Sequence, residues 1–260
     1  MLLRSITKHI KQQNWFAVFV DFLIVVVGVF IGIQVANWNE SRENERIAEE
    51  YIERLQAEVR IENQTHQHVF DYLRTVRTYG FAALAAFKQP VETLDSAFLI
   101  NLYQASQTWN YQPSLSTYNE LLATGRISLI TDLNKRKALS GYFLGRAGSA
   151  NTIEKSSYTP YRTTIRSYMD SDIQMQVRNA CGDNYTFSES NMTYLNLPKR
   201  CEIKVSDGLA STEIQRLHAN ERVRQDLRFH LGEIDVALAS LKNGINAGNA
   251  TLAILAEPTR

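Results

Sequence analysis

Residues 15–35 read WFAVFVDFLIVVVGVFIGIQV, and this stretch decides the architecture that we expect. About twenty predominantly apolar residues in a helix, each rising 1.5 Å, cross the ~30 Å hydrocarbon core of a bilayer. Asp21 is the only ionisable residue among them. A helix packed on the surface of a soluble protein would show a polar stripe, which this stretch lacks. We therefore predict a transmembrane helix over residues 15–36.

The charges on either side of this helix set its expected orientation. Three basic residues and no acidic one precede it, namely Arg4, Lys8 and Lys11. The segment that follows, NESRENERIAEE, contains more glutamate than arginine. By the positive-inside rule, residues 1–14 form a cytoplasmic tail and residues 37–260 an extracytoplasmic domain. In a Gram-negative bacterium this is an inner-membrane protein with a periplasmic domain.

A cleaved signal peptide is the alternative interpretation of the N-terminus. Its apolar core would be shorter, about 7 to 15 residues, and would end in a small-x-small cleavage site. Here Gln34 occupies a position where cleavage after Ala36 requires a small residue. Trp15 and Trp38 bracket the apolar run as interfacial aromatic residues do. We therefore favour an uncleaved anchor.

Three residues of the anchor are candidates for association within the membrane. Gly28 and Gly32 form a G-x-x-x-G motif, which permits close approach of a second helix and favours homodimerisation. The alternative is that glycine is simply frequent in membrane helices. Asp21 could pair with a partner helix, because carboxylates inside hydrocarbon are costly, or it could be a tolerated acid near the interface.

Cys181 and Cys201 are the only cysteines in the chain. An oxidising compartment would let them form a disulfide, which closes a polar, turn-rich loop and stabilises the fold by roughly 3 kcal/mol. The alternative is two unrelated buried thiols. A metal site is less favoured, because neither cysteine has a nearby Cys or His at ligand spacing.

Apolar residues in two long segments repeat at alternating steps of three and four, as in a helix with one buried face. The first set is Ala48, Ile52, Leu55, Val59, Val69, Leu73, Val76, Ala83 and Phe87, with Glu62, His66 and Gly80 at the remaining positions. The second set is Leu217, Leu227, Leu231, Ile234, Leu238, Leu241, Ile245, Leu252 and Leu255. We predict a mainly α fold in which these helices form an antiparallel bundle or coiled coil.

The segment between the two stripes predicts shorter helices. Residues 93–109 read as one helix, and Thr117-x-x-Glu120 offers a capping box for the next. Asp132 is placed to cap a further helix that we expect to continue to about Tyr168. Strand signals are weak, so we interpret residues 126–130 and 201–205 as loop or edge segments.

Two segments resemble a large bacterial family of unknown function. They are NWFAVFVDFLIVVVGVFIGIQVANWNESR at residues 14–42 and STYNELLATGRISLITDLNKRKALSGYF at residues 116–143, under a third of the chain together. Members of that family look like single-pass membrane proteins with a helical extracytoplasmic domain. The resemblance supports the topology and implies no catalytic residue.

Composition and motifs give no sign of enzymatic or nucleic-acid chemistry. Lys and Arg number 28 against 27 for Asp and Glu, a balance that gives no reason to expect a nucleic-acid partner. The chain contains no H-E-x-x-H, G-x-S-x-G or G-x-x-x-x-G-K-[ST] motif, and we expect no cofactor. His66 and His68 point to different helix faces and do not suit a metal ion. We interpret His218 and His230 as surface or core-edge residues.

Several aromatic residues cluster around a proline-containing break in the middle of the chain. They are Tyr103, Trp109, Tyr111 and Tyr118. Such residues could line a pocket for a ligand or a partner. Packing between helices explains them as well, and we favour packing.

Two hypotheses for function follow. The leading one is a non-enzymatic envelope protein, anchored in the lipid bilayer, whose helical outer domain binds another protein or a second copy of itself. The alternative is a periplasmic sensory or small-molecule-binding module that signals through a membrane partner. An enzyme is a third and weaker hypothesis, because no motif supports it.

Overall fold

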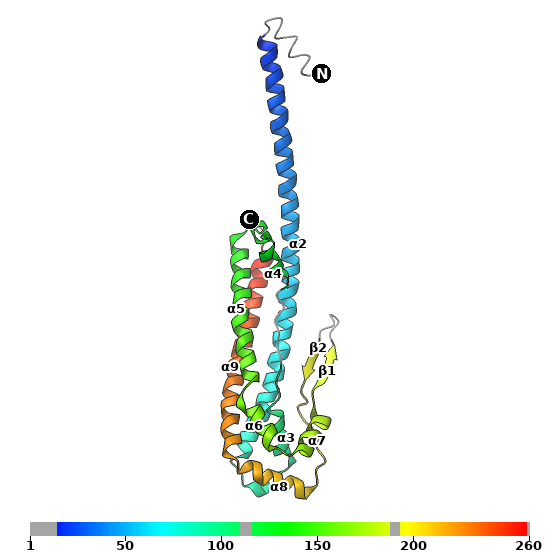
Figure 1. Ribbon diagram of the computed structural model, residues 1–260, viewed down its shortest axis with the longest axis vertical. Helices are drawn as coiled ribbons and strands as arrows, with labels where there is room; N and C mark the ends of the chain where they lie inside the picture. Colours follow the sequence, from blue (N-terminus) through cyan, green and yellow to red (C-terminus); the bar gives the residue numbers. More distant parts are fainter. Residues whose placement is uncertain (1–14, 110–115, 188–192, 259–260) are drawn as a thin grey trace.

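The computed structural model describes residues 15–109, 116–187 and 193–258, and helices dominate this part of the chain. Figure 1 shows that the upper part of helix α2 (Trp15–Ala86) projects alone, whereas its lower part lies beside α5 (Leu133–Ser157) and α9 (Glu221–Ala256). The prediction of a mainly α chain that begins with a long apolar helix is confirmed.

Helix α2 is 72 residues long and changes character along its length. Its first part is apolar on all sides and open to the surroundings, with the Phe16 side chain 77% exposed. Ala48 is the first buried residue, and the predicted stripe then faces the core. Among the described residues, α2 is the helix long and apolar enough to cross a membrane, by length and composition.

Helix α9 packs along α2, and the contacts show that the two run in opposite directions. Leu231 lies against Gly80, where an added Cβ would approach its side chain to 2.5 Å. At the other end, Gly248 lies so close to Asn63 that an added Cβ would overlap the amide oxygen. Small residues at both ends therefore permit the close approach of the two helices.

Helix caps explain where several elements begin. Asp132 accepts hydrogen bonds from the backbone N–H groups of Asn134 and Lys135 and starts α5, as predicted. Asn220 accepts from the Val223 N–H and starts α9 immediately after α8 (Asp207–His218). Gly125, at φ 69°, adopts the left-handed conformation between α4 (Ser116–Ala123) and the 3₁₀ helix η2 (Arg126–Leu129).

Two predicted helices prove shorter than expected. The helix that starts at Leu133 was predicted to reach Tyr168, but it ends at Ser157, and α6 (Pro160–Tyr168) follows as a separate helix. Pro160 has no N–H and would clash with the preceding turn, so it occupies the first turn of a new helix. The helix predicted over residues 93–109 is reduced to α3 (Ser96–Gln104), preceded by the 3₁₀ helix η1 (Val91–Thr93).

The predicted capping box at Thr117 is wrong. Thr117 lies inside α4, which starts at Ser116, so its side chain is past the capping position. Glu120 instead reaches across to α2, where its carboxylate accepts a hydrogen bond from the Tyr51 hydroxyl at 2.7 Å and pairs with Arg54 at 2.6 Å. The acid therefore joins two helices and does not cap one.

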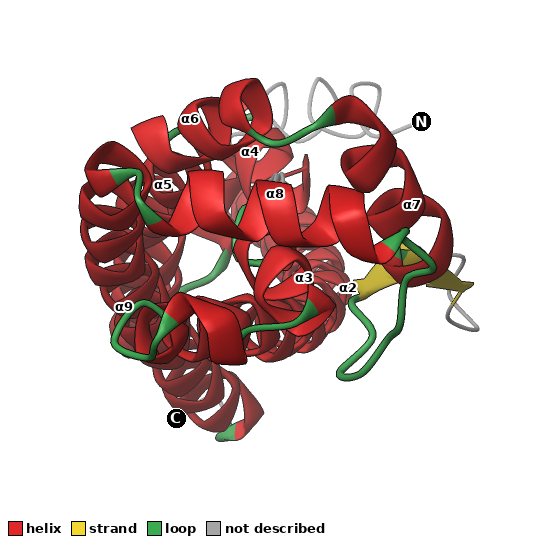
Figure 2. Cartoon of the chain, turned by 90° about the horizontal axis from the view of Figure 1, so that it is seen from below, coloured by secondary structure: helices red, strands yellow, loops and turns green. Residues whose placement is uncertain are grey.

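Small elements close the lower end of the bundle. Helices α6 and α7 (Ser171–Cys181) lie beside α3, and Figure 2 shows α8 crossing this end. Strands β1 (Asn184–Phe187) and β2 (Thr193–Asn196) pair antiparallel in a hairpin that the sequence did not predict.

The buried residues form two apolar clusters separated by a polar layer. The upper cluster includes Tyr51, Val59 and Phe143, and the larger lower cluster begins at Val69 on α2. Glu62 and His66 lie on α2 between them, at positions where the apolar stripe is interrupted.

Candidate functional site

The three association candidates of the anchor lie on the open upper part of α2. An added Cβ at Gly28 or Gly32 would meet nothing within 4 Å, so the structure leaves this face accessible along its length. Asp21 lies two turns above Gly28 on the same helix. These positions make no contact with the lower bundle that would fix a role for them.

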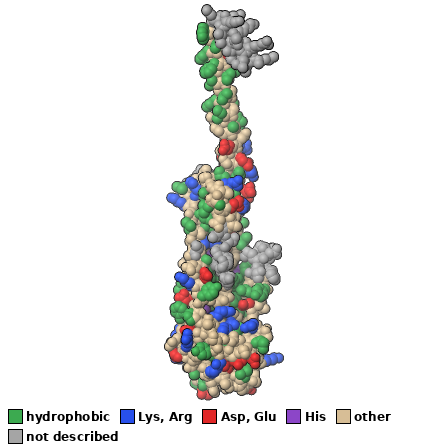
Figure 3. Space-filling view, in the orientation of Figure 1, with side chains coloured by type: hydrophobic (Ala, Val, Ile, Leu, Met, Phe, Trp, Pro, Cys, Tyr) green, Lys and Arg blue, Asp and Glu red, His purple; other side chains and the backbone are tan. Residues whose placement is uncertain are grey.

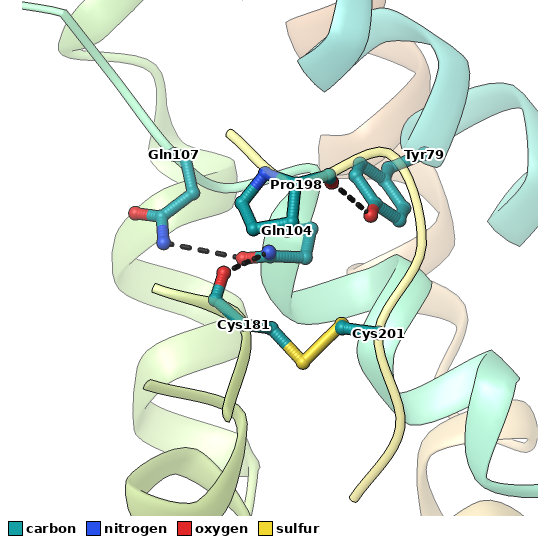
Figure 4. Close-up of a disulfide and its surroundings, with 6 residues drawn as sticks. All are labelled: Tyr79, Gln104, Gln107, Cys181, Pro198 and Cys201. Carbon is teal, nitrogen blue, oxygen red and sulfur yellow. Dashed lines mark hydrogen bonds between the residues drawn. A yellow bond between two sulfur atoms is a disulfide. The ribbon is translucent and has the colours of Figure 1, made fainter. Parts of the chain in front are cut away.

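The predicted disulfide is present between Cys181 and Cys201, and it ties the end of α7 to the segment after the hairpin. Figure 4 shows its surroundings. The buried Gln104 side chain donates a hydrogen bond to the Cys181 carbonyl at 2.6 Å. The Tyr79 hydroxyl donates to the Pro198 carbonyl at 2.5 Å. The disulfide loop is therefore held against both α2 and α3.

The four aromatic candidates do not form one site. Tyr103 and Trp109 belong to the lower apolar cluster, whereas Tyr118 belongs to the upper one and stacks on Phe143 at 4.5 Å between ring centroids. Tyr111 lies outside the described residues. The Tyr103, Trp109 and Tyr118 side chains are buried, as packing between helices requires.

Two arginines contact Tyr103 and a third lies beside them, and sequence reasoning did not single them out. The Arg166 guanidinium lies over the Tyr103 ring, 3.5 Å from its centroid. The Arg178 Nε donates a long hydrogen bond of 3.4 Å to the Tyr103 hydroxyl. Arg162 donates to the Ser106 carbonyl at the end of α3. The spacing of Arg162 and Arg166, one helical turn apart, was the only sequence signal that could have joined two of them.

The polar layer between the apolar clusters holds buried charges. Glu62 on α2 pairs with Arg146 on α5, and both side chains are 3% exposed. The His66 Nε2 lies 3.5 Å from the same carboxylate. Burial, with the nearby Arg146 charge, lowers the pKa of His66 to about 4. Gly244 on α9 leaves room for this imidazole, because an added Cβ would approach the ring to 2.9 Å.

The side chains of His66 and His68 contact different neighbours, as predicted from their positions on different helix faces. His68, two residues from His66, stacks on Tyr194 of β2 at 3.7 Å between ring centroids. Among the described residues, no group of three or more His, Cys, Asp or Glu side chains is placed to hold a metal ion.

His230, which we expected at the surface or the core edge, is 1% exposed. Its Nε2 lies 2.9 Å from the Ala105 carbonyl, which can only accept, so this nitrogen donates. The Nδ1 then accepts from the Thr159 hydroxyl at 2.6 Å. Burial lowers the pKa of His230 to about 4. The imidazole is buried because Thr159, next to the break at Pro160, and Ala105, at the end of α3, both lie against this side of α9.

A cavity of about 740 Å³ lies just below the apolar part of α2. Its walls are α2 from Asn37 to Ile52 and the segment from Ser128 to Lys135. The lining carries the carboxylates of Glu40, Glu45, Glu49 and Asp132 and the ammonium group of Lys135.

Comparison with known proteins gave no significant match. No protein-family model, no curated protein and no solved structure matches the chain. The resemblance to a bacterial family of unknown function therefore stays a prediction.

Proposed function

We propose that this protein is a single-pass inner-membrane protein of bacteria whose helical outer domain acts by binding another protein. The observation that carries the proposal is the form of α2, in which an apolar segment, exposed along its length, continues without a break into a packed bundle. Exposed apolar surface of this extent on a single helix requires cover, and a lipid bilayer is the cover that its length fits.

A line of exposed, uncharged residues on α9 supports association with another protein. Phe229 and Val236 are 57% and 54% exposed and lie two turns apart. Gly232 and Ala239 continue the same line at steps of three and four, and both are exposed. Helices that dock on one another present faces of this spacing. The opposite face of α9 is already occupied by α2 and α5.

The topology can be tested in membranes of the native host. We expect the chain to stay in the membrane fraction after alkaline carbonate extraction, and an added protease to reach residues 37–260 only from the periplasmic side. Extraction into the soluble fraction, or digestion from the cytoplasmic side, would contradict the proposal.

Association can be tested with a photoreactive amino acid in place of Phe229. The matched control places the same amino acid at Lys137, an exposed residue of α5. We expect a defined adduct with another protein from position 229 and none from position 137. Equal labelling from both positions, or no adduct from either, would argue against a docking face on α9.

The cavity beside the anchor favours a second candidate function, the binding of a small molecule. It lies where the bundle meets the apolar segment, so an occupant would touch both α2 and the start of α5. Such an occupant could bias the helix that enters the membrane. Replacement of Ala48 in the cavity wall by Trp would fill this space. If the protein is a sensor, this variant should lose its response to the small molecule. The adducts from position 229 should persist.

A further inference from the structure

The arginines around Tyr103 are held in fixed positions by neutral partners. Arg166 stacks on the phenol ring, and its Nε donates to the Ser106 hydroxyl at 2.9 Å. Arg162 donates to the Ser106 carbonyl. Arg178 comes from another helix, α7, and reaches the Tyr103 hydroxyl. Three guanidinium groups from two helices therefore lie around Tyr103 and Ser106, two of them in contact with the tyrosine.

This cluster has more positive than negative charge. In the described part of the chain, none of the three arginines forms an ion pair with an acidic side chain. The carboxylate whose charge acts on Arg162 and Arg166 is Asp183, and it already accepts a hydrogen bond from the Tyr72 hydroxyl at 2.9 Å. The whole chain carries a formal charge of only +1. The excess of positive charge is therefore local to the cluster of Arg162, Arg166 and Arg178.

Burial makes the excess charge costly. The pKa of Arg166 falls to about 10, chiefly through loss of solvation, with further lowering by the charges of Arg162 and Arg178. A partly desolvated guanidinium that lacks an anion is stabilised when an oxyanion binds it, and the planar fork suits two carboxylate oxygens. Asp183 supplies one carboxylate charge beside three guanidinium groups, so a further anion would still be stabilised at this place.

We propose that Arg162, Arg166 and Arg178 bind the carboxylate side chains of an acidic segment of a partner protein. Arg178 is exposed and the other two are half-buried, so the cluster opens on the surface. Figure 3 shows basic side chains gathered on the lower body, where Figure 1 places α6, α3 and α7. Arginine beside an aromatic side chain is a frequent centre of protein interfaces. The inference rests on the proposed association function and adds the chemistry of the partner.

The test uses the full chain in nanodiscs of phosphatidylcholine and a fluorescein-labelled octaglutamate peptide, followed by fluorescence anisotropy. Arg178→Glu is the main variant, because its side chain is exposed and its hydrogen bond within the described part of the chain goes to the Tyr103 hydroxyl. Arg228→Glu on α9 is the matched control, since Arg228 is also exposed and the change in charge is identical. Circular dichroism verifies that both variants keep their helices.

We expect saturable binding of the peptide that Arg178→Glu weakens by about tenfold or more, and that Arg228→Glu changes by less than about twofold. Octaglutamine should not bind. Equal loss in the two variants, or no binding by the parent chain at low ionic strength, would overturn the assignment. Displacement of the peptide by inorganic phosphate at a lower concentration than by free glutamate would also overturn it, in favour of a small-oxyanion site.

These outcomes are separable from those of the proposed function. The peptide assay needs no natural partner, so its failure would remove the acidic-segment site and leave the adducts from position 229 unaffected. Conversely, peptide binding without any adduct in cells would keep the arginine site and contradict association in the envelope.

Discussion

The buried imidazole of His230 predicts that the protein loses stability in mild acid. Its ordinary pKa of 6.5 falls to about 4 in the folded chain, mainly because burial disfavours the charged form. The Ala105 carbonyl opposes this shift, and the charge of Arg162 adds to it. Between these two pKa values the unfolded chain binds a proton that the folded chain rejects. Stability is therefore present above about pH 6.5 and is lost as the pH falls toward 4.

The size of this loss follows from proton linkage. With pKa values of 6.5 unfolded and about 4 folded, His230 destabilises the fold by roughly 2 kcal/mol near pH 5 relative to neutral pH. His66, whose pKa burial also lowers to about 4, adds a loss of the same sign that remains in the His230 variant. The replacement His230→Gln removes the titration but keeps a donor for the Ala105 carbonyl. It should cost about 1–3 kcal/mol at neutral pH through the lost Thr159 contact, and should flatten the acid dependence by roughly 2 kcal/mol.

The measurement is urea unfolding of the full chain in detergent, followed by Trp109 fluorescence. Replacing Trp15 and Trp38 by Phe makes Trp109, which lies in the lower cluster, the sole tryptophan. Midpoints are compared at neutral pH and near pH 5. The control is His68→Gln, whose ring is only half-buried, and it should keep the parental difference between the two pH values. An unchanged difference in His230→Gln would refute the reasoning.

Three further predictions concern packing and covalent structure. Replacing both Cys181 and Cys201 by Ser should lower the free energy of unfolding by roughly 3 kcal/mol, seen as a lower urea midpoint in the Trp109 assay; the same midpoint with and without the disulfide would contradict this. Gly248→Ala should destabilise by about 1–3 kcal/mol, because the new Cβ overlaps a side chain of α2, whereas Gly232→Ala, with open space around it, should raise the thermal midpoint slightly. Arg146→Met should lower the free energy of unfolding by about 3–5 kcal/mol, since it leaves the Glu62 carboxylate buried without its cation. Replacing Glu62 as well should recover most of this loss.

The long helices could be predicted because their signals are local and repeat. The three- and four-residue stepping placed Glu62, His66 and Gly80 on the same stripe as the apolar residues, and all three are buried. The cap at Asp132 needed only the residues next to it. The disulfide followed from there being two cysteines and an oxidising compartment.

The rest depends on contacts between distant segments. Glu120 matched a local capping pattern, but its partners are Tyr51 and Arg54 on another helix. The hairpin of β1 and β2 is short and polar, and its strands carry no clear alternation. The arginine cluster combines α6 and α7 with the end of α3, so no spacing in the sequence brings Arg178 to Arg162 and Arg166.

The unbroken course of α2 also fixes the distance between its apolar segment and the lower part of the bundle. From Trp38 at the end of the apolar segment to Tyr72 beside the arginine cluster, the helix rises by about 50 Å, and Ala86 lies about 70 Å from the same point. With the apolar segment in a bilayer, lipid headgroups cannot reach Arg162, Arg166 or Arg178. A partner of the proposed kind would have to extend that far from the membrane or arrive from the aqueous phase.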